Sequence, residues 1–201
     1  MANTSLTPEF VSFPNRRRWT RDECRRLEDM GLLAGRYELI DGEILSLMGQ
    51  NPPHRIVVIL LSGWLASLFG FTTVQTQGPI AIPGEDGETN EPEPDIAVTR
   101  ESTTAYLSRH PEPPELLLAV EVSDTTLGFD LNTKARLYAR HGVQEYWVMD
   151  INGRCLHRHR APSPEGYREV VVLTAEQSVS PMARPDAAVG VRELLPPVED
   201  H

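Results

Sequence analysis

The chain has 201 residues, of which 40% are hydrophobic, so it is long enough to bury a core without disulfides. Its two cysteines, Cys24 and Cys155, have no Cys or His partners at zinc-finger spacing, so the sequence indicates neither a disulfide framework nor a structural zinc finger. No stretch approaches the roughly 18 apolar residues of a membrane span, and the N-terminus lacks a continuous apolar segment. We expect a cytoplasmic protein with no membrane partner, in which a flexible segment (1–17) precedes one domain (18–196) and a tail (197–201).

The net charge of −10 is unfavourable for binding nucleic acid, because Lys and Arg contacts to phosphate supply most non-specific affinity. An acidic chain can still carry a local basic face. The arginines that could form one are Arg16, Arg17, Arg18, Arg154, Arg158 and Arg160. A solvated surface is the alternative interpretation of these residues.

The first two elements are predicted by the residues at their boundaries. Thr20 and Glu23 have the spacing of a capping box, which predicts a short helix that ends near Gly31. Asp41 and Gly42 separate two β-rich segments, and this dipeptide suits a two-residue type I′ turn. We therefore expect an N-terminal helix followed by a β-hairpin.

Hydrophobic spacing predicts the remaining elements. Apolar residues at helical spacing over 52–69 indicate the principal buried helix. The expected strands span 71–77, 79–82, 95–98, 116–122, 143–151, 154–160 and 167–173, with a helix over 130–141, a hairpin turn at 152–153 and a proline-rich C-terminal cap. Strand, helix and strand in succession predict a crossover unit. The fold class that follows is α/β (α+β), a mixed β-sheet flanked by helices.

Two carboxylates stand at the ends of predicted strands. Glu121 closes a nearly continuous apolar run, where an ionised carboxylate costs desolvation free energy unless a cation lies nearby. Asp95 begins a short strand upstream, with enough chain between the two for a loop and a neighbouring strand. Carboxylates on neighbouring strand ends are suitable ligands for a hard divalent cation.

Lys134 lies in the helix that follows the Glu121 strand, so its ammonium could point back over the strand end. There it could hold an attacking water or offset transition-state charge. The alternative is an i,i+4 ion pair with Asp130 on an exposed helix face, and spacing alone does not decide between the two.

Four segments, taken in order, resemble a known family. They are YELIDGEI at 37–44, His54 at the start of the long helix, EPDIAV at 93–98, and EVSDTTLGFDLNTKARLYARHGVQEYWVMD at 121–150. Pro94-Asp95, Glu121-Val122-Ser123 and Lys134 resemble the motif of the PD-(D/E)XK nuclease superfamily. More narrowly, the four segments resemble the Uma-two family of restriction endonuclease-like proteins, over roughly residues 20–195.

The resemblance implies a restriction-endonuclease-like fold that binds Mg²⁺ or Mn²⁺ and hydrolyses phosphodiester bonds. It implies that Asp95 and Glu121 are catalytic metal ligands, together with the backbone carbonyl of Val122. Glu38, in the YELIDGEI segment, would be a further metal or water ligand. These oxygen donors suit either cation.

One position departs from the plain motif of the family. Ser123 stands where the motif usually has lysine, so Lys134 is the expected replacement on the helix. His54 is expected to contact phosphate or the leaving group, with a helix cap or a surface position as the alternative.

Other polar and aromatic residues have simpler interpretations. His157 and His159 could form a metal pair, but no carboxylate accompanies them in the sequence and an exposed strand edge is favoured. Asp150 is expected to begin the turn before Asn152. The aromatic residues favoured for core packing over base stacking are Tyr138, Tyr146 and Trp147.

The predicted function is that of a metal-dependent endonuclease acting on DNA. A homodimer would be the simplest way to cut both strands of a duplex. Two alternatives stay open: a catalytically inactive nuclease fold that serves binding or assembly, and a hydrolase of small phosphate substrates.

Overall fold

The computed structural model describes residues 17–47, 49 and 51–197, so most of the expected N-terminal segment and tail lies outside the described residues. The helices are α1 (Arg21–Asp29), α2 (Pro52–Phe69), α3 (Leu127–Phe129) and α4 (Ala135–Arg140), with a π-helical turn (Asp130–Lys134) joining α3 to α4. The 3₁₀ turns are Phe71–Thr73, Glu85–Glu88, Thr103–Tyr106, Pro113–Glu115 and Val191–Leu194. The strands are β1 (Tyr37–Ile40), β2 (Glu43–Ser46), β3 (Val74–Thr76), β4 (Ile96–Thr99), β5 (Leu116–Ser123), β6 (Glu145–Asp150), β7 (Cys155–Ser163), β8 (Gly166–Thr174), β9 (Ser178–Val179) and β10 (Val189–Gly190).

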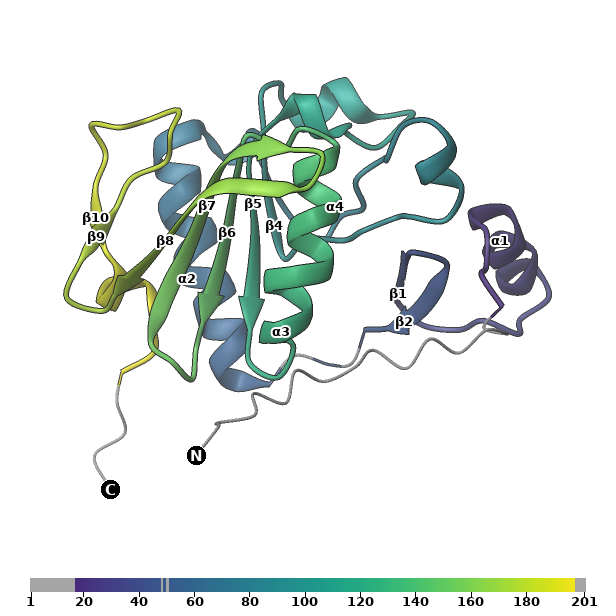
Figure 1. Cartoon of the computed structure of the whole chain (residues 1–201), viewed down its shortest axis with the longest axis horizontal. Coiled ribbons are helices and arrows are strands. Elements are labelled where there is room, and N and C mark those ends of the chain that lie inside the picture. Colours follow the sequence, from purple (N-terminus) through teal and green to yellow (C-terminus); the bar gives the residue numbers. More distant parts are fainter. Residues whose placement is uncertain (1–16, 48, 50, 198–201) are drawn as a thin grey trace, which may run out of the picture.

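A six-stranded sheet in the order β3-β4-β5-β6-β7-β8 forms the centre of the molecule (Figure 1). Strands β5 and β6 are parallel, and the other neighbours are antiparallel. The parallel pair is connected by α3 and α4, as expected for a crossover unit. The predicted mixed sheet with flanking helices is therefore confirmed.

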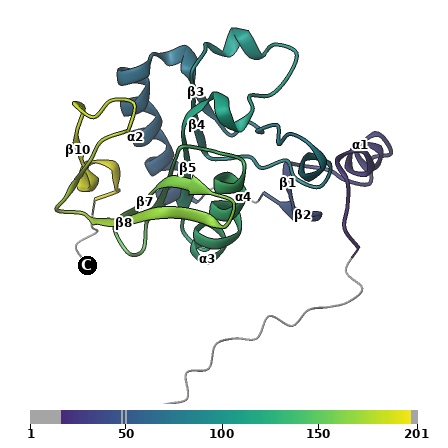
Figure 2. The same ribbon diagram turned by 45° about the horizontal axis from the view of Figure 1, so that its top comes forward.

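Helices cover both faces of this sheet, with α2 behind it and α3 and α4 in front (Figures 1 and 2). Leu61 and Leu65 of α2 are fully buried in the same cluster as Trp147 of β6. On the opposite face, Tyr138 of α4 packs against Tyr146, with 5.0 Å between ring centroids. The aromatic residues assigned to the core are indeed buried.

The β1–β2 hairpin is a separate two-stranded sheet beside the main one (Figure 1). Asp41 and Gly42 have φ angles of 49° and 78°, the positive values that a type I′ turn requires. Leu39 and Glu91 exchange backbone hydrogen bonds of 3.4 and 2.7 Å, and these join the hairpin to the segment that leads into β4. The hairpin is thereby placed next to the main sheet.

Helix α1 begins with the predicted capping box. The Glu23 backbone N–H donates to Thr20 Oγ1 at 3.3 Å, and the Thr20 N–H donates to Glu23 Oε2 at 3.0 Å.

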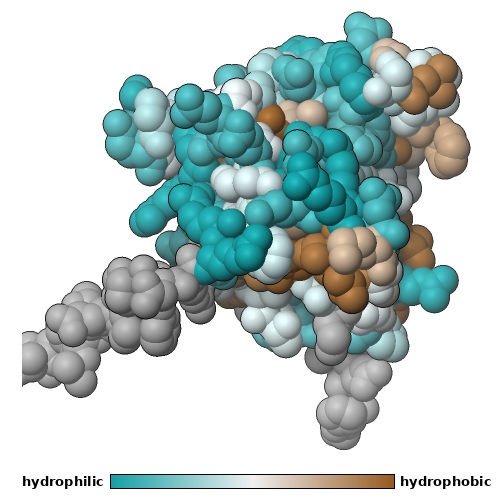
Figure 3. Space-filling model, turned by 90° about the vertical axis from the view of Figure 1, so that its right-hand side faces the viewer, coloured by the Kyte–Doolittle hydropathy of each residue, from teal (hydrophilic) through white to brown (hydrophobic). Residues whose placement is uncertain are grey.

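The face of the molecule on the side of α1 and the hairpin is mostly hydrophilic, with a band of hydrophobic side chains below its centre (Figure 3).

Helix α2 has 18 residues and a hydropathy of 1.3, so by length and composition alone it could cross a membrane. This measure does not separate a span from a core helix, and one side of α2 packs on the sheet. The predicted principal helix is buried on that side only, because Ile59 on its other side is 57% exposed.

Three local predictions were wrong. Residues 79–82 do not form a strand; Ile80 instead donates a backbone hydrogen bond to Pro92 O. The connection between β6 and β7 has four residues, 151–154, with a positive φ of 50° at Arg154, because the paired strands end at Asp150 and Cys155. The helix expected over 130–141 begins at Leu127 and contains the π-helical turn.

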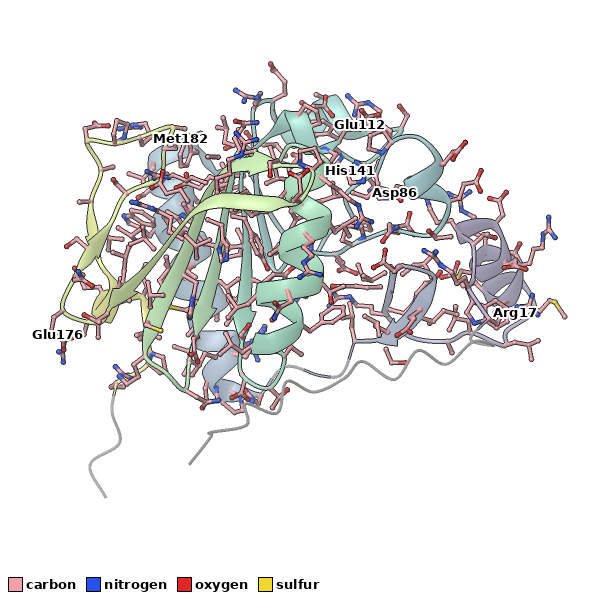
Figure 4. The ribbon with its side chains drawn as sticks, viewed as in Figure 1. Arg17, Asp86, Glu112, His141, Glu176 and Met182 are labelled. Atoms are coloured by element: carbon pink, nitrogen blue, oxygen red, sulfur yellow. The ribbon has the colours of Figure 1, made fainter. Side chains whose placement is uncertain are left out.

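Several of the arginines proposed for a basic face are bound to nearby carboxylates. Arg17, beside α1 in Figure 4, pairs with Glu23 at 2.8 Å, and Arg158 pairs with Glu169 at 3.1 Å. Figure 4 also shows Asp86 next to His141, whose Nε2 lies 2.9 Å from Asp86 Oδ2. The acidic 3₁₀ turn is thus attached to the C-terminal end of α4.

Candidate functional site

The expected site residues meet in one pocket at the C-terminal end of β5. The pocket has a volume of about 540 Å³ and extends between the hairpin, the start of α2 and the segment around α3. The residues of interest that line it are Glu38, His54, Asp95, Glu121, Val122 and Lys134. The structure therefore brings together all the residues that were predicted for the catalytic and metal site, although their roles stay predictions.

The pairing of β4 with β5 determines where Asp95 lies. Ile96 is opposite Val120, so Asp95, which precedes Ile96, lies beside the following residues of β5. The Val122 backbone N–H donates to Asp95 Oδ2 at 2.9 Å. Because β4 begins at Ile96 and the preceding Pro94 has no backbone N–H to donate to a ladder, Asp95 lies at the strand end.

A buried ion triad lies next to this carboxylate. Lys134 Nζ donates to Glu38 Oε1 at 2.8 Å and to Glu121 Oε1 at 2.9 Å. All three side chains are at most 7% exposed. The alternative partner of Lys134, Asp130, makes no ion pair with it among the described residues. The lysine is therefore directed into the pocket and not toward a solvated helix face.

Burial and charge change the proton affinity of this triad. Burial raises the pKa of Glu38, and it raises the pKa of Glu121 well above the usual range. Burial lowers the pKa of Lys134, but the charges of Glu121 and Glu38 outweigh this and raise it. A charged lysine thus lies between carboxylates that are costly to ionise, and an additional cation would favour their ionised form.

His54 is in the first turn of α2, whose N-cap residue, Asn51, accepts the His54 backbone N–H at 3.0 Å. Its Nε2 lies 3.2 Å from Asp95 Oδ2, so the side chain faces the pocket. Burial lowers the pKa of His54, but the hydrogen bond and charge of Asp95 raise it, and the net shift is upward. Nδ1 is buried and has no hydrogen-bond partner within the described part of the chain.

Ser123 is fully buried and takes part in a different contact from the lysine of the usual motif. Its hydroxyl donates to Asp130 Oδ2, and Thr126 Oγ1 donates to the same oxygen at 2.6 Å. Asp130 is thereby held against the end of β5. The serine attaches the start of the π-helical turn to the strand, while Lys134 at the end of that turn reaches the carboxylates.

Tyr138 is a site residue that sequence reasoning assigned only to the core. Its ring is fully buried, but its hydroxyl donates to Glu121 Oε1 at 3.0 Å. The signal that could have revealed this contact is the spacing of Asp130, Lys134 and Tyr138, which are four residues apart on successive helical turns.

The donor set of the pocket fits a hard divalent cation. Asp95, Glu121 and Glu38 supply only oxygen ligands, and with Lys134 their formal charge is −2, three carboxylates against one ammonium. Val122, whose carbonyl was expected to be a ligand, is placed beside Asp95. Mg²⁺ or Mn²⁺ would balance this charge, and no sulfur or nitrogen donor is needed.

A second cluster corrects the interpretation of the two histidines. Strand β7 lies between β6 and β8, so it is not a sheet edge, and a carboxylate does accompany His157. Asp150, Cys155 and His157 have ligand atoms that all lie within 4.8 Å of one another. His159 instead packs between Tyr146 and Tyr167, at centroid distances of 5.3 and 5.5 Å. Sequence reasoning missed this cluster because the strand pairing that adds Asp150 is not visible in the spacing.

Comparisons with known proteins agree with this architecture. No curated protein matches the chain. A solved structure from Anabaena variabilis ATCC 29413, described as a "putative nuclease belonging to DUF820", has a TM-score of 0.62 and covers 84% of this chain and 96% of that chain. At 14% identity this likeness shows the fold alone. The family model Uma2, described as "Putative restriction endonuclease", matches residues 22–192, and the chain therefore belongs to the Uma2 family of restriction endonuclease-like proteins.

Proposed function

We propose that this protein is a metal-dependent endonuclease that hydrolyses phosphodiester bonds of DNA. The observation that supports the proposal most directly is the convergence of Glu38, Asp95, Glu121 and Lys134 on one pocket. Clustered buried carboxylates cost folding free energy, and a fold used only for binding has no physical need of them. Membership of the Uma2 family supports the reaction class.

Asp95 and Glu121 would hold one Mg²⁺ or Mn²⁺, with the Val122 carbonyl and Glu38 completing the protein ligands. When bound, the cation would polarise a phosphoryl oxygen and lower the pKa of a bound water. The charge of the carboxylates supports a divalent ion, and the pocket volume of about 540 Å³ leaves room for waters and a phosphate.

The protein's own groups would orient the reactants. Lys134 Nζ, already within hydrogen-bond distance of two carboxylates, would donate to the attacking water and offset charge on the phosphate. Tyr138 would fix the rotamer of Glu121 through its hydroxyl, and the Val122 N–H would do the same for Asp95. His54, whose Nε2 faces Asp95 in the pocket, would contact phosphate or the leaving group.

The small number of free cations in the pocket favours a second candidate, the hydrolysis of a small phosphate ester rather than of DNA. The pocket has six acidic lining residues, Glu38, Glu93, Asp95, Glu121, Asp124 and Asp130, and its basic residues are Arg36 and Lys134, beside His54. Arg36 is engaged by Glu93 and by Gln77 Oε1. A long DNA groove requires more free cations than this pocket offers.

The test is cleavage of supercoiled DNA, single-stranded DNA and a small phosphodiester by the wild type, Asp95→Ala and Lys134→Ala. Each reaction is run in Mg²⁺, in Mn²⁺ and in EDTA. We expect metal-dependent DNA cleavage that both variants lose. Cleavage confined to the small ester would support the second candidate. If no substrate is cleaved although Mn²⁺ binding depends on Asp95, the endonuclease proposal is wrong.

A further inference from the structure

The sheet carries a group of Asp, Cys and His side chains outside the proposed nuclease site, with ligand atoms close enough to hold a metal ion. Asp150 ends β6 and pairs with Cys155 at the start of β7, while His157 pairs with Val148. Side chains of directly paired residues project from the same face of a sheet. Ser123 pairs with Asp150, and its hydroxyl contacts Asp130, so this is the face covered by α3 and α4.

The distances within the cluster suit a tetrahedral ion. Cys155 Sγ lies 3.6 Å from His157 Nε2 and 4.0 Å from Asp150 Oδ2. Zinc bonds of about 2.3 Å to sulfur and about 2.1 Å to nitrogen place those two atoms about 3.6 Å apart at a tetrahedral angle. The corresponding sulfur–oxygen separation is about 3.5 Å, which a small rotation of Asp150 would supply. A metal could therefore enter without rearrangement of the strands.

One ligand is already oriented by the turn that follows it. Asp150 Oδ1 accepts the Gly153 backbone N–H at 2.8 Å, which leaves Oδ2 directed at the sulfur. A side chain at Gly153 would collide with this carboxylate, because a Cβ there would lie 2.2 Å from Oδ2. Such a hydrogen bond to the free oxygen of a ligating carboxylate is the usual outer-shell support of a metal site.

A nucleophilic cysteine is the main rival interpretation of this cluster. In such a site the imidazole activates the sulfur and the carboxylate orients the imidazole. Here the carboxylate faces the sulfur itself, and no hydrogen bond joins Asp150 to His157 within the described residues. Three ligand atoms around one point fit a bound cation better than the chain of proton transfers that a nucleophilic cysteine requires.

We propose that Asp150, Cys155 and His157 form a binding site for Zn²⁺ or a similar borderline transition metal, with a fourth position for water. Thiolate and imidazole donors select such a metal over Mg²⁺, which prefers oxygen alone. The site would be distinct from the carboxylate pocket and does not rest on the proposed nuclease activity. It would also tie β6 to β7 beside Asn152, whose amide donates to the backbone oxygen of Asp124 at 2.7 Å.

The experiment uses the full chain, freed of metal with a chelator and then titrated with Co²⁺ in excess Mg²⁺. We expect one Co²⁺ per chain, with a sulfur-to-cobalt charge-transfer band that added Zn²⁺ abolishes by displacement. Cys155→Ser should lose the band, and His157→Ala and Asp150→Asn should weaken binding at least about tenfold. A wild type without the band, or a Cys155→Ser variant with unchanged affinity, would overturn the proposal.

Two control variants separate this site from the rest of the chain. Cys24→Ser changes the other cysteine, which is buried in α1, and should keep the band. Glu121→Gln changes the carboxylate pocket and should bind Co²⁺ with the same sulfur band, whether or not the protein cleaves DNA. Loss of the band in Cys24→Ser alone would place the metal at Cys24 and contradict the proposal. Circular dichroism of each variant verifies that the fold is retained.

Discussion

Lys134 and Glu38 are 96 residues apart in the sequence, yet Lys134 Nζ donates a hydrogen bond of 2.8 Å to Glu38 Oε1. The lysine comes from the crossover helix of the main sheet, and the glutamate comes from the separate hairpin. This ion pair, with Glu121 as the third member, therefore joins the two sheets at the pocket.

Replacing Lys134 by Met should destabilise the metal-free protein by about 3–5 kcal/mol, because two buried carboxylates would lose their only lysine partner in the described structure. Urea unfolding in EDTA measures the loss. The double variant Glu38→Gln, Lys134→Met should recover part of it, since one buried charge is removed together with the cation. A single-variant loss below about 1 kcal/mol would mean that the triad is not buried as described.

Replacing Tyr138 by Phe should leave the packed ring in place but remove the hydroxyl that donates to Glu121. We expect Mn²⁺ affinity and any metal-dependent cleavage to fall about 10-fold or more, as for other outer-shell partners of metal ligands. Isothermal titration with Mn²⁺ checks the affinity. The matched control is Tyr146→Phe, whose lost hydroxyl donates to Asp130 O at 3.0 Å and touches no proposed ligand. Equal effects of the two substitutions would remove Tyr138 from the site.

Glu145 is fully buried on the α2 side of the sheet and should contribute strongly to stability. It accepts hydrogen bonds from Trp147 Nε1 at 3.0 Å, Arg160 Nε at 2.8 Å and the Met182 backbone N–H at 2.6 Å. Glu145→Ala leaves these donors unpaired, and we expect a loss of about 3–5 kcal/mol in chemical unfolding.

Glu169 is the control for Glu145, because it also pairs with an arginine, Arg158, but is half-exposed. Glu169→Ala should cost less than about 1 kcal/mol, since solvent screens an exposed ion pair. Similar losses for both alanine variants would contradict the importance assigned to burial.

The stability of the protein should fall in mild acid because of His159. Burial, followed by the charge of the neighbouring His157, lowers the pKa of His159 to about 4. In the unfolded chain the imidazole has its ordinary pKa of about 6.5, so between these values the unfolded state binds more protons. This contribution is fully present above about pH 6.5 and is lost as the pH falls toward about 4, on the order of 3 kcal/mol in total.

Chemical unfolding of the chelated wild type and of His159→Phe, at several pH values, tests this assignment. The phenyl ring can keep the packing against Tyr146 and Tyr167 without titrating. The difference in stability between the two proteins should therefore shift in favour of the variant as the pH falls. A difference that is constant over this range would assign the acid sensitivity to other groups.

Most of the fold could be predicted because its elements have local signals. The capping box at Thr20 predicted α1, and the Asp41-Gly42 turn predicted the β1–β2 hairpin. The apolar run that ends at Glu121 predicted β5. Glu121 could be predicted from the cost of placing charge at a strand end, and Asp95 from its place at the start of a neighbouring strand, whereas Glu38 was assigned only through the family resemblance. Lys134 could not be assigned from its spacing alone, because Asp130 offered an equally near partner until the hairpin brought Glu38 to it.

The contacts that could not be predicted depend on pairing between distant segments. Asp150 joins Cys155 and His157 only through the β6–β7 register, and Arg160 is directed to Glu145 by the same register. The four-residue turn at 151–154 was also missed. The Asn152-Gly153 dipeptide predicted the position of the turn, but the pairing of Asp150 with Cys155 determines the length of the turn.

The π-helical turn at Asp130–Lys134 has a consequence for the length of the chain at this point. A π turn is equivalent to one additional residue in an α-helix, and an α-helix rotates by about 100° per residue. The π turn takes up this residue within one turn, so the two halves of the helix stay in phase, whereas regular α geometry over the same residues would turn Asp130 and Tyr138 relative to each other by about that angle. A regular helix of this length could keep either the Ser123 contact at its start or the Glu121 contact at its end, but not both. Deletion of the exposed Asn132 with a return to regular α geometry should therefore preserve both contacts, so this turn is a place where the chain can change its length by one residue.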